Sequence, residues 1–115
     1  MIALPALPAS RHAWGTITWL ASAQRGNAAG GTLGRVVISP GCANPPHRHD
    51  RCEEILHLLS GTLLHRIGDA EVRMVAGDTL VIPPGVVHCG RNDGDEPADM
   101  MVSYDSADRD FIPST

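Results

Sequence analysis

Glycine and proline punctuate this chain so densely that long helices cannot fit between them. Its 115 residues include 12 glycines and 9 prolines, and the segments between them are short and rich in Val, Ile, Leu and Thr. Such segments favour β-strands, because β-branched side chains pack well on a pleated surface. The expected strands are residues 16–21, 33–38, 54–60, 62–67, 71–75, 79–82, 87–91 and 98–103. This pattern predicts an all-β fold, either a small sandwich or a barrel.

The size of the chain is that of one ordinary domain. At 12.2 kDa, with 43% hydrophobic and 19% charged residues, it can bury most of its apolar surface in a single core. We therefore expect a single domain over residues 1–115. Residues 1–10 and 106–115 show no strand pattern and are expected to be irregular arms that lie over the barrel or over a second subunit.

Charge and cysteine content exclude several classes of protein. The net charge is -4, and the nine basic residues are scattered arginines, so neither nucleic acid nor an anionic membrane is an expected partner. No apolar stretch is long enough to span a membrane, and the first ten residues lack a basic region, which predicts a cytoplasmic protein without a cleaved signal. The three cysteines contain no CxxC pair and are expected to be free thiols.

Three histidines and one glutamate form the pattern with the clearest chemistry. His47 and His49 are two residues apart, so on an extended segment both imidazoles project from the same side. Glu54 opens the next expected strand, and His88 follows a Pro-Pro-Gly corner from which a neighbouring strand can return to the same point. Three imidazoles and a carboxylate suit one divalent transition metal per chain, and this donor set alone leaves Fe(II), Mn, Ni, Zn, Co and Cu open.

The spacing of these residues resembles a known family. Residues Gly41 to Gly61 read G-x5-H-x-H-x4-E-x6-G, and Gly77 to Asn92 read G-x5-P-x-G-x2-H-x3-N. These segments, which form a motif core over residues 41–92, are similar to the two motifs of the cupin superfamily, and the chain resembles its small single-domain (monocupin) members. The resemblance implies a single jelly-roll β-barrel with a metal centre that has open positions for water, substrate or dioxygen. The implied metal ligands are His47, His49, Glu54 and His88.

Strand alternation sorts the side chains around this centre. If Glu54 points inward, then Ile55, His57 and Leu59 lie on the opposite face, and His57 is not at the metal. An outward face with two large apolar residues needs cover from a second sheet, from the N-terminal arm or from a partner subunit, and the last of these is the hypothesis of a homodimer.

The alternation leaves the role of His65 open. It shares the more apolar face of its strand and either lines the pocket as a proton-transfer residue or is a buried histidine bonded to a backbone carbonyl. Glu54 is a second candidate catalytic base. Cys52 is expected to be a small buried or loop thiol, and Trp14 and Trp19 are expected to pack in the core or in a dimer interface.

Three functions fit these features. The favoured one is a dioxygenase, with Fe(II) as the favoured metal, that oxidises a small enolisable substrate. The alternatives are a non-oxidative isomerase, lyase or cyclase acting on a sugar, uronate or polyketide carbonyl, and a binding module without turnover. The lining of the pocket discriminates between them. His65 together with an arginine facing the metal favours carbonyl chemistry, whereas a purely apolar pocket favours dioxygen chemistry. Arg35 and Arg66 are the arginines to consider, although alternation turns Arg66 outward.

Overall fold

The computed structural model describes residues 3–5 and 7–114, and within these residues it contains strands and turns but no helix. No helix that could cross a membrane occurs in this part of the chain. The strands are β1 (Ser10–His12), β2 (Gly15–Ala21), β3 (Thr32–Ile38), β4 (His47–Arg48), β5 (Glu54–Ser60), β6 (Thr62–Ile67), β7 (Ala70–Val75), β8 (Thr79–Ile82), β9 (His88–Arg91), β10 (Ala98–Tyr104) and β11 (Ile112–Pro113). The all-β prediction is confirmed.

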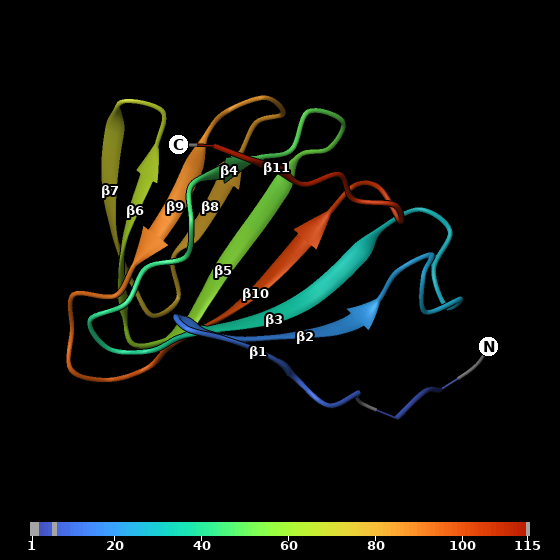
Figure 1. Ribbon diagram of the computed structural model, residues 1–115, viewed down its shortest axis with the longest axis horizontal. Coiled ribbons are helices and arrows are strands. Elements are labelled where there is room, and N and C mark those ends of the chain that lie inside the picture. Colours follow the sequence, from blue (N-terminus) through green and yellow to red (C-terminus); the bar gives the residue numbers. More distant parts are fainter. Residues whose placement is uncertain (1–2, 6, 115) are drawn as a thin grey trace.

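The strands form two antiparallel sheets that face each other across the core (Figure 1). One sheet has the order β1-β2-β3-β10-β5-β8, and the other has the order β11-β4-β9-β6-β7. Several neighbouring strands, such as β3 and β10 or β4 and β9, come from distant parts of the sequence, as in a jelly roll. The side chains between the sheets are almost completely excluded from solvent, and they include Ile38, Leu58, Leu63, Met74 and Met100.

Alternation along β5 and β6 follows the sequence prediction. Glu54 is buried, whereas Ile55 and Leu59 are 41% and 47% exposed on the opposite face. The turn that joins the two strands requires glycine, because Gly61 has a φ of 80° and an added Cβ would lie 2.4 Å from the carbonyl oxygen of Pro97. The turn carries the chain from the sheet of β5 to the sheet of β6, and alternation within each strand turns Glu54 and His65 toward the core.

The predicted arms are more ordered than expected. Ser10 begins β1, which pairs with β2, and Ile112–Pro113 forms β11, which pairs with β4. The expectation of irregular structure over 106–115 is therefore wrong at β11. This strand is stabilised by hydrogen bonds to β4, and such pairing cannot be predicted from the local sequence pattern. Residues 1, 2, 6 and 115, which belong to the same predicted arms, lie outside the described residues.

Candidate metal centre

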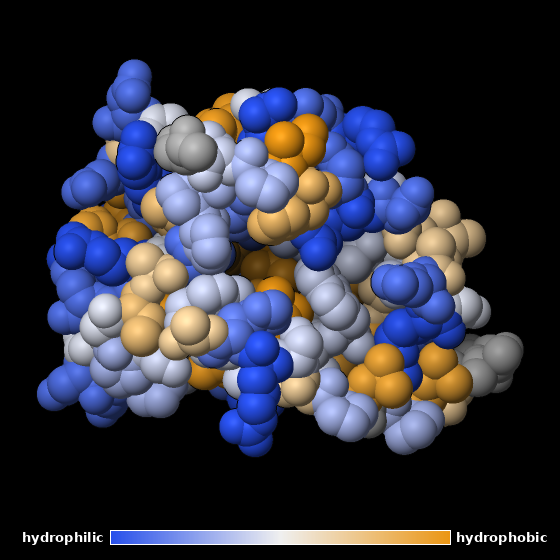
Figure 2. All heavy atoms as spheres, viewed as in Figure 1, coloured by the Kyte–Doolittle hydropathy of each residue, from blue (hydrophilic) through white to orange (hydrophobic). Residues whose placement is uncertain are grey.

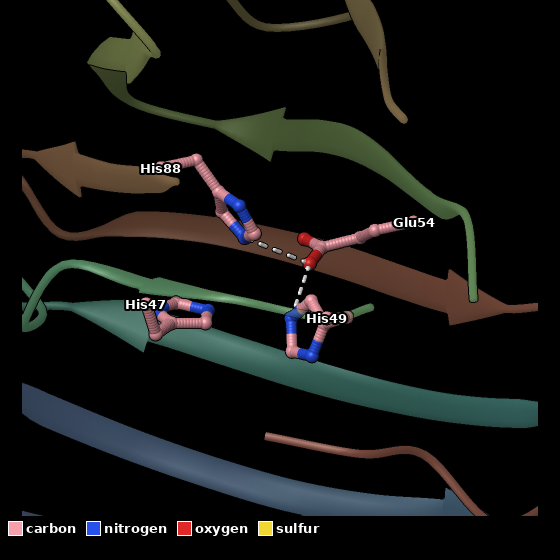
Figure 3. A group of neighbouring side chains, drawn as sticks. All are labelled: His47, His49, Glu54 and His88. Atoms are coloured by element: carbon pink, nitrogen blue, oxygen red, sulfur yellow. Dashed lines mark ion pairs between the residues drawn. The ribbon is translucent and has the colours of Figure 1, made fainter. Parts of the chain in front are cut away.

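The four predicted ligands come from three neighbouring elements. His47 lies on β4, His49 follows it by two residues, and Glu54 is the first residue of β5. His88 is the first residue of β9 and pairs directly with His47 across the β4–β9 ladder. All four side chains are buried, between 2% and 7% exposed. Figure 3 shows them pointing toward one common point.

The distances between these side chains are those of a metal site. His47, His49, Glu54 and His88 each offer one ligand atom, and these atoms lie within 4.8 Å of one another. The Nε2 atoms of His49 and His88 are both 3.3 Å from the same oxygen, Oε1 of Glu54. The rings of His47 and His88 have centroids 4.3 Å apart. The spacing predicted from the sequence thus brings all four groups together.

Backbone carbonyl groups hold the three imidazoles in place. Nδ1 of His47 lies 2.8 Å from the carbonyl oxygen of Pro45, and Nδ1 of His88 lies 2.9 Å from that of Val86. Nδ1 of His49 lies 2.5 Å from the carbonyl oxygen of Asp110. A proton on each Nδ1 makes these contacts hydrogen bonds, which leaves each Nε2 with a free lone pair.

The inner atoms of the site fit a bound cation. Nε2 of His49, Nε2 of His88 and Oε1 of Glu54 are buried without a hydrogen-bond partner among the described residues. Buried polar atoms are rarely left in this state, because each loses its interactions with water. Three lone pairs and one carboxylate oxygen around a common point are the donor set of a divalent transition metal. The residues therefore form a four-residue metal site.

Burial and mutual contact shift the pKa values of these groups. Burial alone would raise the pKa of Glu54, but the imidazoles of His49 and His88 lower it well below its ordinary value. Burial would likewise lower the pKa of His88, and the Glu54 carboxylate raises it. His47 has no such partner at close range, so burial lowers its pKa to about 4. Glu54 is thus a carboxylate, and His47 is a neutral imidazole, at neutral pH.

His65 reaches the same region from β6. It is 2% exposed, and its ring lies 5.8 Å from that of His88, centroid to centroid. Neither ring nitrogen has a hydrogen-bond partner among the described residues, so the alternative of a carbonyl-bonded core histidine is not what the structure shows. Burial lowers the pKa of His65 to about 4, which keeps its imidazole neutral.

A cavity of about 410 Å³ opens from these residues toward solvent. Figure 2 shows the molecule hollowed near the centre of this view, with hydrophobic atoms in the depth of the hollow. His47, Glu54, His65 and His88 all line the cavity. Its other walls are mostly apolar and aromatic, and they include Trp14, Ile17, Trp19, Leu56, Met100 and Phe111.

The arginine that lines the cavity is not one of those considered from the sequence. Arg35 is exposed and pairs with Asp99, and Arg66 is exposed and donates to the carbonyl group of Gly68. Arg109 lines the cavity instead, from the stretch after the last long strand. Sequence reasoning missed it because residues 106–115 carry neither a strand pattern nor a motif.

Residues 109–113, here called the C-terminal segment, cover the metal site from outside. Besides the contact of its carbonyl oxygen with His49, Asp110 accepts backbone N–H bonds from Asp50 and Arg51, at 2.7 and 3.2 Å, on its carboxylate. Phe111 stacks on His47 with centroids 4.7 Å apart. Cys52 is buried and its Sγ lies 3.7 Å from Oδ1 of Asp110, and this sulfur and a carboxylate oxygen of Asp110 lie within 4.8 Å of a ring nitrogen of His49.

Several plant proteins are similar to this chain in sequence. A germin-like protein of Arabidopsis thaliana is 34% identical over 85 residues, which is 70% of this chain and 39% of the relative. Oxalate oxidase 1 of Hordeum vulgare is 37% identical over 101 residues, which is 77% of this chain and 49% of the relative. The chain spans half or less of the length of these relatives.

Solved structures and a family model agree with the fold. An oxalate oxidase in complex with glycolate has a TM-score of 0.78 and 33% identity, covering 90% of this chain and 56% of that one. The oxalate decarboxylase of Lactobacillus farciminis, in complex with formate, has a TM-score of 0.85 at 23% identity, over 93% of this chain and 33% of that one. The model of the cupin domain matches residues 34–104. The chain belongs to the cupin domain family.

Proposed function

We propose that this protein is a metal-dependent oxidoreductase that oxidises a small enolisable acid, with dioxygen as the electron acceptor. The observation that carries the proposal is the cluster of buried, unpartnered ligand atoms at the inner end of a cavity large enough for a small molecule. The similarity to oxalate oxidase 1 supports an oxidase-type reaction, and the glycolate held by a related structure supports an acid substrate.

His47, His49, Glu54 and His88 would hold the ion, and Fe(II) or Mn(II) suits this mixed nitrogen and oxygen donor set. When bound, such an ion supplies a Lewis acid that stabilises an enolate and a centre that exchanges electrons with dioxygen. The protein's own contribution is orientation. The carbonyl groups of Pro45, Val86 and Asp110 fix the imidazoles.

His65 is the residue that we assign to proton transfer. It lines the cavity, it is neutral at neutral pH, and its Nδ1 and Nε2 atoms have no competing partner in the described chain. A neutral imidazole next to the ligand cluster can accept a proton from the α-carbon of a substrate. Glu54 is the alternative base, but its contacts with His49 and His88 engage the carboxylate in the ligand set.

A non-oxidative reaction is the second candidate, and one observation favours it. His65 and Arg109 both line the cavity, which is the combination expected for isomerase, lyase or cyclase chemistry on a carbonyl substrate. Both candidates begin with the same step, the removal of a proton next to a carbonyl group. They differ in whether electrons then leave the substrate.

The test is to compare metal content with oxygen consumption. Protein produced without a metal-affinity tag would be analysed for bound metals and then assayed with small 2-hydroxy and 2-oxo acids in an oxygen electrode. An oxidase transfers two electrons and two protons from substrate to dioxygen and yields hydrogen peroxide, whereas a dioxygenase places both atoms of isotopically labelled dioxygen in the product. Turnover without oxygen uptake would support the non-oxidative candidate, and bound ligand without turnover would support a binding module.

A cytoplasmic location and a homodimer stay predictions from the sequence. Ile55 and Leu59, exposed on the outer face of β5, support the dimer. Size-exclusion chromatography with light scattering of the wild-type chain and of a Leu59→Glu variant tests it, because a charge at this face would separate the subunits.

A further inference from the structure

The guanidinium of Arg109 has no charged partner within the described residues. It takes part in no ion pair and in no hydrogen bond there, although it is only partly exposed. Its neighbour Asp110 is engaged by the N–H groups of Asp50 and Arg51. An arginine held at a cavity wall without an anion is uncommon, because partial burial weakens its contact with water and nothing replaces it.

Aromatic rings hold this guanidinium in position. Its Cζ atom lies 4.5 Å from the ring centroid of Trp19, 5.4 Å from that of Tyr104 and 5.5 Å from that of Phe111. Contact with the faces of aromatic rings leaves the N–H donors in the guanidinium plane free. These donors match the two oxygens of a carboxylate, which can accept two parallel hydrogen bonds.

The aromatic rings also connect this cation with the metal site. Phe111 stacks on His47 at 4.7 Å, and Tyr104 meets His49 at 5.0 Å, both measured between centroids. The ring of Phe111 therefore lies between Arg109 and His47, and the ring of Tyr104 lies between Arg109 and His49. Arg109 lines the same cavity as the ligands. A substrate whose carboxylate pairs with Arg109 can extend along the cavity and place an enolisable carbonyl group at the ligand cluster.

The remaining walls set the character of the rest of the substrate. Trp14, Ile17, Leu56 and Met100 line the cavity, and its volume of about 410 Å³ lies in the range of sites for complete organic ligands. A diacid such as oxalate has no apolar part to bury against these side chains. An aromatic or branched substrate would bury its apolar surface against these side chains, which favours its binding.

We infer that the cavity binds a monocarboxylate with an apolar, aromatic-sized body, and that Arg109 is the residue that selects its carboxylate. The inference rests on the proposed function in taking this cavity as the substrate site, and it narrows the class of acid. Arg109 is a specificity-determining residue of the C-terminal segment, separate from the ligand cluster.

The test measures binding rather than turnover, so that it does not depend on the reaction. Trp14 and Trp19 are the only two tryptophans of the chain and both line the cavity, so their fluorescence reports an occupant directly. The probes are 3-phenylpropanoate, its uncharged analogue 3-phenylpropan-1-ol, and oxalate. We expect 3-phenylpropanoate to bind the wild-type protein at least about tenfold more tightly than either of the other probes.

Variants separate the two parts of the inference. Arg109→Gln should weaken 3-phenylpropanoate binding at least about tenfold and leave 3-phenylpropan-1-ol unchanged, with Arg109→Lys intermediate. Arg66→Gln, at an exposed position outside the cavity, is the matched control and should bind as wild type. Circular dichroism confirms that each variant is folded.

Each contrary result has one meaning. Unchanged 3-phenylpropanoate binding in folded Arg109→Gln would overturn the role of Arg109, and loss of binding only after metal removal would show that the ion holds the carboxylate instead. Oxalate binding as tight as that of 3-phenylpropanoate, or tighter, would overturn the inference that the substrate has an apolar body. Metal content measured on the same samples keeps the proposed function separate, since a protein without metal can still pass the binding test.

Discussion

The first residues of β4, β5 and β9 and the C-terminal segment both belong to the metal site, but they contribute differently. The strands, together with His49 directly after β4, supply the ligand atoms, whose spacing follows from alternation along the chain and from the pairing of His47 with His88. The C-terminal segment supplies no ligand. It contacts Nδ1 of His49 through the Asp110 carbonyl oxygen, and the ring of His47 through Phe111.

The difference shows how one fold can hold the metal with one set of residues and shape the cavity with another. Ligand atoms on paired strands are difficult to alter without loss of the metal, because their positions depend on the sheet. The C-terminal segment touches both the ligands and the cavity without supplying a ligand, so its side chains can affect the cavity while the ligand set stays the same. Arg109, the cation of the cavity, belongs to this segment.

The largest effect is expected from a change in the ligand set. His49→Ala removes one of four ligands and should reduce the bound metal to a small fraction of one ion per chain. Elemental analysis of wild type and variant, purified side by side, measures this. Unchanged metal content would show that the ion binds elsewhere, and that the residues on the strands are not its ligands.

The next effect tests whether the C-terminal segment positions a ligand. Asp110→Ala removes the carboxylate that accepts the N–H groups of Asp50 and Arg51, so the segment loosens and His49 loses a fixed partner. Residues that orient metal ligands change metal affinity by about tenfold to a hundredfold. Competition with a chelator measures the affinity.

Two control variants accompany this prediction. Asp110→Asn keeps an oxygen for the N–H groups and should recover most of the affinity. Asp108→Ala, an exposed acid in the same stretch, should have no effect. A wild-type affinity in Asp110→Ala would mean that the segment covers the site without orienting it.

A smaller effect reports on whether the segment is closed. Burial is the main cause that raises the pKa of the Cys52 thiol to about 11, and the nearby Asp110 carboxylate adds to it. Alkylation of Cys52 in a Cys42→Ser, Cys89→Ser background should therefore be slow at neutral pH and rise as the pH approaches 11. In Asp110→Ala the same alkylation should be several times faster, because the segment no longer covers the sulfur. Equal rates in both proteins would show that burial by the sheets alone protects Cys52.

The sequence was sufficient for everything that depends on alternation and motif spacing. The inward direction of Glu54 and His65, the outward exposure of Ile55 and the meeting of His47 with His88 all follow from period-two strands and their pairing. It was not sufficient for the cavity walls. Trp14 and Trp19 pack against the core but also line the cavity, a placement that depends on where the sheets diverge.

The C-terminal segment was missed for a different physical reason. Its contacts with β4 and with the loop after it bridge residues about sixty positions apart, and such pairing leaves no local periodicity in either partner. Arg109 follows from the sequence as a charged residue only, because its environment is set entirely by tertiary contacts with Trp19, Tyr104 and Phe111.

The smallest expected effect tests the strand register on which both regions depend. His57 lies on β5 three residues after Glu54, and its Nδ1 is 2.8 Å from Oγ1 of Thr79 in an exposed contact on the outer face. His57→Ala should leave metal content unchanged and alter the free energy of unfolding by no more than about 1 kcal/mol, the usual range for an exposed hydrogen bond. Elemental analysis and denaturant unfolding of the variant measure both quantities. Loss of the metal would place His57 on the inner face, shift β5 by one residue and turn Glu54 away from the imidazoles, so this mild substitution bears on the whole arrangement of the site.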